Sequence, residues 1–129
     1  MKTISQSYHI DAPVEEVWGA LVKPDVIKEW SGKPADMDET IGKDFSLWGG
    51  DIHGTNTDVD INHKLVQDWY AGSWSEPSKV TFTLTAENDG TRLELLHENV
   101  PDDEYKDIDE GWHEYYIGAL QQYLESKTE

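Results

Sequence analysis

The sequence contains no cysteine, few basic residues and no long apolar run, and each of these absences excludes a class of protein. Without cysteine there are no disulfides, no thiolate nucleophile and no cysteine-ligated zinc, which fits a reducing compartment. Residues 1–10 alternate polar and apolar side chains, so they predict neither a signal peptide nor a membrane span. We therefore expect a cytoplasmic protein that is not inserted in a membrane.

Basic residues are scarce relative to acidic ones. Ten Lys and Arg stand against 27 Asp and Glu, which gives a formal net charge of −17 at pH 7. Nucleic acids and acidic membranes are normally bound through clustered Lys and Arg, so neither is expected as a partner. Two interpretations of the charge stay open. It could attract a cationic partner, or it could maintain solubility, for example in a salty cytoplasm that screens self-repulsion.

The chain also lacks the short motifs of common chemistries. It has no Gly-x-Ser-x-Gly, no phosphate-binding loop and no dinucleotide fingerprint, and Arg92 is its only arginine. The histidines show no zinc spacing. Residues 58–62 begin like a calcium loop, but His63 stands where glycine is required and Trp69 where a bidentate glutamate is required. No catalytic residue, no metal site and no cofactor are predicted from these patterns.

Amphipathic aromatic residues are abundant in the chain. Six Trp and six Tyr accompany only two Phe among 129 residues. Each such side chain can bury ~150–250 Å², so most of them are expected in a core and some beside a cavity. No repeat, linker or low-complexity tract divides the sequence. Residues 1–129 are therefore expected to fold as a single domain.

The N-terminal part predicts one strand followed by two short helices. Residues 3–10 alternate as a strand, and Pro13 then marks a helix start. An apolar stripe at helical spacing follows: Val14, Val17, Trp18 and Leu21. Pro24 interrupts this stripe, and a second short helix is expected to end near Gly32.

Strand patterns and turns alternate in the middle of the chain. The predicted strands are 44–48, 57–62, 65–74, 80–86 and 91–97. Gly49-Gly50 and Asp89-Gly90 are the turn signals of two hairpins. Hairpin-linked strands indicate an antiparallel sheet.

The C-terminal segment predicts one long amphipathic helix that ends near Ser126. One face of it carries Trp112, Tyr116, Ala119 and Tyr123. Asp109 is expected to cap the start of this helix, with a separate turn before it. The acidic stretch 102–110 has two interpretations, as a source of carboxylates for a cation or basic partner, or as a solvated helix-start face.

The order of these elements predicts an α+β domain of the helix-grip type. A curved antiparallel sheet of about six to seven strands would wrap the long C-terminal helix, with the two short helices after the first strand. The aromatic residues would then occupy the space between the sheet and the helix.

Both ends of the sequence resemble a known family. Residues 10–18, Ile-Asp-Ala-Pro-Val-Glu-Glu-Val-Trp, with Trp30 further on, resemble the opening of the SRPBCC (START-like) superfamily. Residues 90–95, Gly-Thr-Arg-Leu-Glu-Leu, with His97 and Gly111-Trp112, resemble the close of its AHSA branch, the homologues of the activator of heat-shock-protein-90 ATPase. The resemblance implies a helix-grip fold with a cavity between sheet and helix, which the superfamily uses for lipids, hormones, polyketides and other apolar ligands.

Three functions are compatible with this resemblance, because the fold hosts many chemistries. The preferred one is binding or carriage of a small hydrophobic molecule, without catalysis. The second is a cyclase- or hydrolase-type enzyme that uses a cavity histidine. The third is a co-chaperone-like module with a protein partner.

The predicted ligand site consists of side chains expected to face the helix or the cavity: Phe45, Trp69, Phe82, His97, Trp112 and Tyr116. His97 shares a strand face with Leu93 and Leu95, so it is expected to point towards the helix. It is either a general base or ligand-binding group, or a core histidine satisfied by a backbone carbonyl or a helix residue. Likewise, the aromatic set either lines a pocket or packs as simple core.

Overall fold

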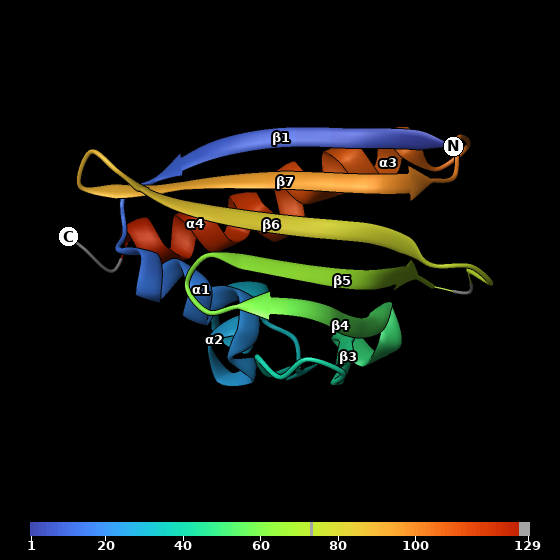
Figure 1. Ribbon diagram of the computed structural model, residues 1–129, viewed down its shortest axis with the longest axis horizontal. Coiled ribbons are helices and arrows are strands. Elements are labelled where there is room, and N and C mark those ends of the chain that lie inside the picture. Colours follow the sequence, from blue (N-terminus) through green and yellow to red (C-terminus); the bar gives the residue numbers. More distant parts are fainter. Residues whose placement is uncertain (73, 127–129) are drawn as a thin grey trace.

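The computed structural model describes residues 1–72 and 74–126, and its main element is one seven-stranded sheet (Figure 1). The strands lie in the order β1-β7-β6-β5-β4-β3-β2, and every neighbouring pair is antiparallel. Their bounds are β1 Lys2–Ile10, β2 Ala35–Asp36, β3 Asp44–Leu47, β4 Ile52–Asp60, β5 Lys64–Ala71, β6 Ser78–Glu87 and β7 Gly90–Val100. The predicted antiparallel sheet of six to seven strands is confirmed.

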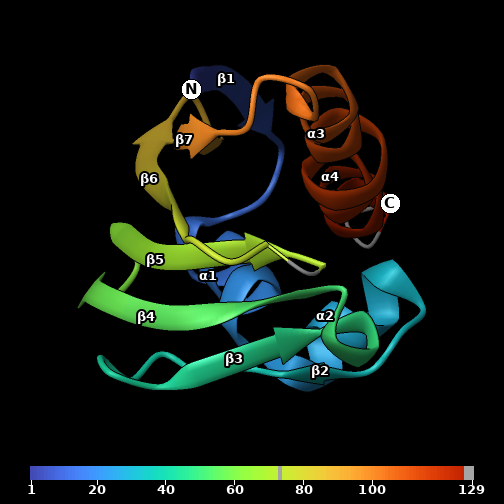
Figure 2. The ribbon, with the colours of Figure 1, turned by 90° about the vertical axis from the view of Figure 1, so that its right-hand side faces the viewer.

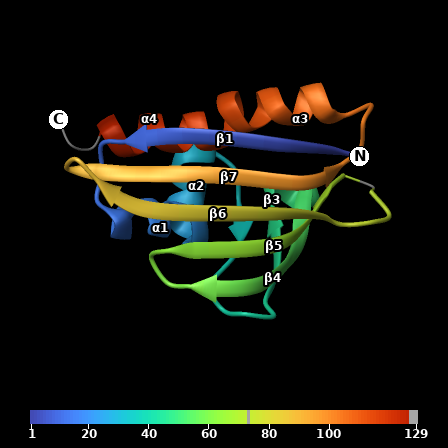
Figure 3. The same ribbon diagram turned by 45° about the horizontal axis from the view of Figure 1, so that its top comes forward.

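The sheet is curved around the C-terminal helical segment. This segment is continuous and consists of α3 (Tyr105–Gly111), a π-helical turn η2 (Trp112–Tyr116) and α4 (Ile117–Ser126). Figure 2, in which β1, β6 and β7 are foreshortened and β3, β4 and β5 run across the view, shows the sheet bent around a concave side, with α3 and α4 beside it. Figure 3 shows the same segment running alongside β1. This arrangement is the predicted helix-grip α+β fold.

Two short helices follow β1, as predicted. The first, α1 (Val14–Val22), begins directly after Pro13, and the second, α2 (Pro24–Ser31), has its proline in the first turn. Gly32 ends α2 in the left-handed conformation, with φ 76°. The Trp30 indole N–H donates to the Ala20 carbonyl at 2.8 Å, which ties the two helices together. None of the helices in the described residues is long and apolar enough to cross a membrane.

The β6–β7 hairpin turns one residue earlier than predicted. Its loop residues are Asn88 and Asp89, because Glu87 pairs with Gly90 across the ladder. Both loop residues have positive φ, 44° and 66°, as a type I′ turn requires. Gly90 is the first residue of β7 rather than a loop residue. Glycine is required there because a Cβ would lie 2.4 Å from the Ile10 carbonyl oxygen of β1.

The predicted bounds of β4 and β5 differ from the structure by three residues or more at one end each and by one or two residues at the other. β4 begins at Ile52 rather than at residue 57, because Gly54 and the fully buried Asn56 interrupt the apolar alternation that a sequence pattern detects. β5 ends at Ala71 rather than at residue 74, because Gly72 adopts a positive φ of 56°.

The start of the long helix also differs from the prediction. Asp109 does not cap the helix, because α3 begins at Tyr105 with Glu104 at the N-cap position, and Asp109 lies inside it. Gln6 Nε2 donates to Asp109 Oδ1 at 2.9 Å and to the Asp109 carbonyl at 3.0 Å. This contact explains why a glutamine stands on the apolar face of β1.

The π turn changes which face of the helix is buried. Of the four residues predicted on one face, Trp112 and Tyr116 are buried, and Ala119 and Tyr123 are partly buried and pack against the core. The buried side chains beyond the turn are Ile117, Leu120 and Leu124. A π turn holds more residues than an α turn, so it rotates the rest of the helix relative to a 3.6-residue pattern.

Candidate functional site

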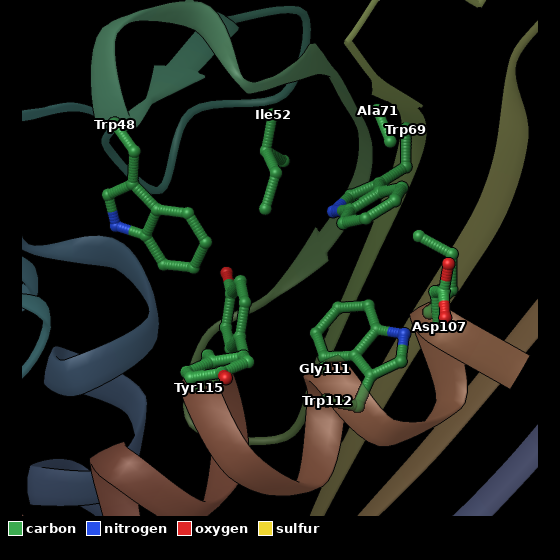
Figure 4. A pocket seen from close by; sticks show the side chains of 10 residues that line it. Trp48, Ile52, Trp69, Ala71, Asp107, Gly111, Trp112 and Tyr115 are labelled. Atoms are coloured by element: carbon green, nitrogen blue, oxygen red, sulfur yellow. The ribbon is translucent and has the colours of Figure 1, made fainter. Parts of the chain in front are cut away.

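A partly open pocket with aromatic walls lies between the hairpin β4–β5 and the start of the C-terminal helical segment (Figure 4). Its volume is about 130 Å³. The residues that line it are Trp48, Ile52, Trp69, Ala71, Asp107, Ile108, Gly111, Trp112, Tyr115 and Tyr116. Asp107 is the one charged side chain of this lining, so the walls are otherwise apolar or aromatic.

Trp48 forms one wall from a strained backbone position. It starts the short helical turn η1 (Trp48–Gly50) with φ 58°, in the left-handed region that a bulky residue rarely adopts. Its ring packs against Trp30 at 6.3 Å and against Tyr116 at 5.7 Å between centroids. Such strain persists only where surrounding packing enforces it, and it is often found at functional sites.

Trp69 forms the opposite wall, and it lies on β5 in the middle of the sheet. It lies on β5 opposite Gly54 of β4, where a Cβ would be 1.8 Å from the Asp68 carbonyl oxygen. Glycine therefore allows the two strands to approach closely beside the indole. The Trp69 ring contacts Trp112 at 5.3 Å and His97 at 4.8 Å between centroids.

The π turn supplies the third wall. Trp112 and Tyr116 are adjacent on its buried face, with ring centroids 4.6 Å apart. Burial raises the pKa of the Tyr116 hydroxyl, so this group stays protonated throughout the physiological range. Tyr115 on the same turn is 69% exposed and lies at the mouth of the pocket.

A chain of hydrogen bonds holds Trp112 and Trp69 in place. The Trp112 indole N–H donates to His97 Nδ1 at 3.0 Å, His97 Nε2 donates to Ser78 Oγ at 2.7 Å, and the Ser78 hydroxyl donates to the Trp69 carbonyl at 2.7 Å. An indole N–H can only donate, so Nδ1 must accept and Nε2 must carry the proton. These hydrogen bonds therefore specify the tautomer of His97, with the proton on Nε2.

His97 is held neutral by its surroundings. Its side chain is fully buried, and desolvation lowers its pKa from 6.5 to about 3. The lone pair on Nδ1 is occupied by the Trp112 N–H, and Nε2 is occupied as a donor. A general base needs a free lone pair that faces the substrate, so this geometry does not favour the predicted enzyme alternative.

The structure brings three of the six predicted ligand-site residues to the pocket: Trp69, Trp112 and Tyr116. The other three are buried beside it. Phe82 packs against Trp112 and Tyr116, with centroids 5.7 Å and 6.1 Å away, and His97 holds Trp112. Phe45 lies in β3 next to Gly54.

Sequence reasoning missed the other seven lining residues, namely Trp48, Ile52, Ala71, Asp107, Ile108, Gly111 and Tyr115. Trp48 was detectable, because a tryptophan directly before two glycines stands at a turn and not in a strand interior. Asp107 and Tyr115 were not detectable, because their position depends on the helix start and the π turn.

Two of the six indole N–H groups are buried and have no acceptor among the described residues, Trp48 Nε1 and Trp69 Nε1. The other four donate to Glu39, Ala20, Glu104 and His97. No group of three or more His, Cys, Asp or Glu side chains in residues 1–72 and 74–126 is arranged to hold a metal ion.

A sheet that grips a long C-terminal helix, with a pocket between them, defines a helix-grip domain of the SRPBCC type. Residues 11–125 match the family described as Activator of Hsp90 ATPase homolog 1-like protein. The chain therefore belongs to this family, which is the AHSA branch indicated by its sequence.

The curated relatives that the chain matches are longer than the chain. It is 30% identical to an uncharacterized protein of Schizosaccharomyces pombe, covering 91% of the chain and 35% of that protein. It is 26% identical to the activator of 90 kDa heat shock protein ATPase homolog of Dictyostelium discoideum, covering 86% and 30%. The chain thus spans about a third of these relatives. The crystal structure of an HSP90 activator from Plasmodium falciparum superposes with a TM-score of 0.87 and 25% identity over 96% of each chain.

Proposed function

We propose that the pocket binds a small, neutral, apolar molecule between the sheet and the C-terminal helix. The supporting observation is the partly open aromatic pocket bounded by Trp48, Trp69, Trp112 and Tyr116. The walls would contact the ligand, while Phe45, Phe82 and His97 would support the walls from behind.

The size of the pocket limits the ligand. An apolar cavity of ~150 Å³ holds a benzene-sized molecule, whereas pockets for drug-sized ligands measure ~300–1,000 Å³. A pocket of about 130 Å³ therefore suits a single ring, or one end of a longer molecule that extends through the mouth. The rim carboxylate of Asp107 and the net charge of −17 disfavour an anion.

Toluene binding to a nitrogen-15-labelled sample tests this proposal. The indole N–H resonances of the pocket tryptophans should shift with saturable dependence on toluene concentration. Ala71→Leu places a larger side chain in the pocket and should weaken binding at least about tenfold, because the ring no longer fits. Ala86→Leu, the same change at an exposed position of β6, is the matched control and should bind like the wild type. Equal affinity in both variants, or no binding by any single-ring compound, would contradict the proposal.

A second candidate function is action on a chaperone of the Hsp90 type. It is supported by the family match and by relatives named as activators of that ATPase. The chain covers about a third of the length of those relatives, so their activity is carried to this chain only as a proposal. The acidic surface is the proposed contact, and long-range charge attraction is weakened by salt.

Stimulation of purified Hsp90 ATPase by this protein tests the second candidate. The rate of ATP hydrolysis should rise with added protein and the effect should weaken as sodium chloride is added. Ala71→Leu should stimulate as well as the wild type, since it changes the pocket and not the surface charge. An ATPase rate that stays constant at all protein concentrations in low salt would exclude this activity for the chain alone.

A further inference from the structure

We infer that the Trp69 indole N–H donates a hydrogen bond to the molecule in the pocket, so the preferred ligand is a neutral ring compound with a carbonyl-type oxygen. This inference rests on the proposed function of the pocket, and it adds the chemical class of the ligand. It depends on one polar group and its surroundings.

The inference is based on the indole N–H of Trp69, a buried hydrogen-bond donor that faces the pocket. Trp69 is only 3% exposed, and its Nε1 has no acceptor among the described residues. Figure 4 shows the nitrogen edge of the Trp69 ring turned towards the space between Trp48 and Trp112, whereas the nitrogen of Trp48 points away from that space. Buried donors in folded proteins are almost always hydrogen-bonded, so an orphan one beside a pocket indicates a ligand acceptor.

Two polar groups near Trp69 are already engaged in hydrogen bonds. The Trp112 N–H is held by His97, and the Ser78 hydroxyl is held by the carbonyl of Trp69 itself. The bond to His97 orients the Trp112 indole and directs its donor away from the pocket, whereas the Trp69 indole is held by ring contacts with His97 and Trp112 and its donor faces the pocket. A buried indole donor without an acceptor in the described residues, at the wall of an aromatic pocket, is suited to position one acceptor atom.

The charges around the pocket select among acceptors. A carboxylate or phosphate would meet the Asp107 carboxylate at the rim and no cation among the described lining residues. A carbonyl oxygen accepts well from an indole N–H without carrying a charge. Together with the pocket volume of about 130 Å³, this favours a flat ring of roughly six to nine heavy atoms that bears a ketone, ester or amide oxygen.

Acetophenone and α-methylstyrene form a matched pair of probes for this inference. They have the same shape, but a methylene group replaces the carbonyl oxygen in the second. The wild-type protein should bind acetophenone about tenfold more tightly, the usual effect of one hydrogen bond to a buried donor. The Trp69 indole N–H resonance should move downfield with acetophenone and not with α-methylstyrene. Benzoate should bind much more weakly than either.

A variant pair assigns the preference to Trp69. Trp69→Phe keeps a flat ring and removes the N–H, so it should bind the two probes with equal affinity. Trp18→Phe is the control, because the Trp18 N–H donates to Glu39 outside the pocket, and it should keep the tenfold preference. If Trp69→Phe fails to fold, the shift of the Trp69 indole N–H resonance in the wild-type protein shows whether this group bonds to acetophenone.

The outcomes separate this inference from the proposed function. Equal binding of the two probes by the wild type, with no movement of the Trp69 resonance, overturns the inference while the pocket remains a binding site. Absence of binding by both probes overturns the proposed function as well.

Discussion

At the scale of single residues, His97 connects the C-terminal helix to three strands of the sheet. It lies on β7, accepts from Trp112 of the π turn, and donates to Ser78 of β6, which in turn donates to the carbonyl of Trp69 on β5. The Trp112 N–H, the His97 Nε2–H and the Ser78 hydroxyl, which form this hydrogen-bond chain, each have an acceptor. A fully satisfied buried network of this kind specifies one packing arrangement, because any other arrangement leaves donors unpaired.

The neutral state of His97 predicts an acid-sensitive fold. Its pKa is about 3 in the folded protein and 6.5 in the unfolded chain, so between these values only the unfolded chain binds the proton. The free energy of unfolding therefore falls as the pH drops below 6.5, and the contribution is fully present above it. Between about pH 7 and about pH 5 the loss from this group is about 2 kcal/mol. Urea unfolding measures it, and His97→Gln should show a weaker pH dependence in that range. Identical pH profiles would contradict the assignment.

Ser78→Ala tests the hydrogen-bond chain itself. The substitution leaves the His97 Nε2–H and the Trp69 carbonyl without their partner, because Ser78 bonds to both. The free energy of unfolding should fall by about 1–3 kcal/mol in urea titrations. The same change at the exposed Ser5 of β1 should alter it by less than about 0.5 kcal/mol. Similar losses at both positions would argue against a special role for the chain.

At the scale of elements, the π turn of the C-terminal segment shapes the pocket. It places Trp112 and Tyr116 on the buried face and Tyr115 at the mouth. Gly118 makes the turn possible, since a Cβ there would lie 1.8 Å from the His113 carbonyl oxygen. The α2 helix and the η1 turn then bring Trp30 and Trp48 against Tyr116.

The two glycines of this segment are expected to respond oppositely to alanine. Gly118→Ala should lower the free energy of unfolding by about 1–3 kcal/mol and disturb ligand binding, because the methyl group displaces the His113 carbonyl. Gly111→Ala should raise it by up to about 1 kcal/mol, because its φ of −62° and ψ of −40° are helical and its Cβ would meet no atom within 4 Å. Urea unfolding of both variants measures the difference. A loss in both would show that the local geometry is not the cause.

At the scale of the whole molecule, charge repulsion opposes folding. A net charge of −17 is spread over a small domain, and few of its carboxylates are paired in the described residues. Ions in solution screen such repulsion within about 8–10 Å at physiological strength. The acidic surface therefore affects stability as well as the choice of partner.

Added sodium chloride is expected to stabilise the protein. The urea midpoint should rise between low and moderate salt, because the folded state concentrates the negative charges more than the unfolded state does. The double substitution Asp58→Asn/Asp60→Asn removes two negative charges from exposed positions of β4. It should raise the urea midpoint at low salt and reduce the increase in midpoint that added salt produces. A midpoint that falls with salt in the wild type would refute this explanation.

The sequence by itself determined the order and type of the elements. The strand β1, the helices α1 and α2 with Pro13, Pro24 and Gly32 at their ends, and the antiparallel hairpins all follow from local signals. These signals are apolar periodicity and backbone preference, which act between residues a few positions apart. They also sufficed to place Trp69, Trp112 and Tyr116 on the faces that meet between sheet and helix.

Only the tertiary structure decided which side chains line the pocket and which polar groups remain free. Gln6 and Asp109 are 103 positions apart in the sequence, and the hydrogen bond between their side chains joins β1 to α3. The π turn and the positive φ of Trp48 depend on packing from several elements at once. Hydrogen-bond partners are chosen by proximity in space, so the engagement of Trp112 by His97 and the free N–H of Trp69 carry no signature in the order of residues.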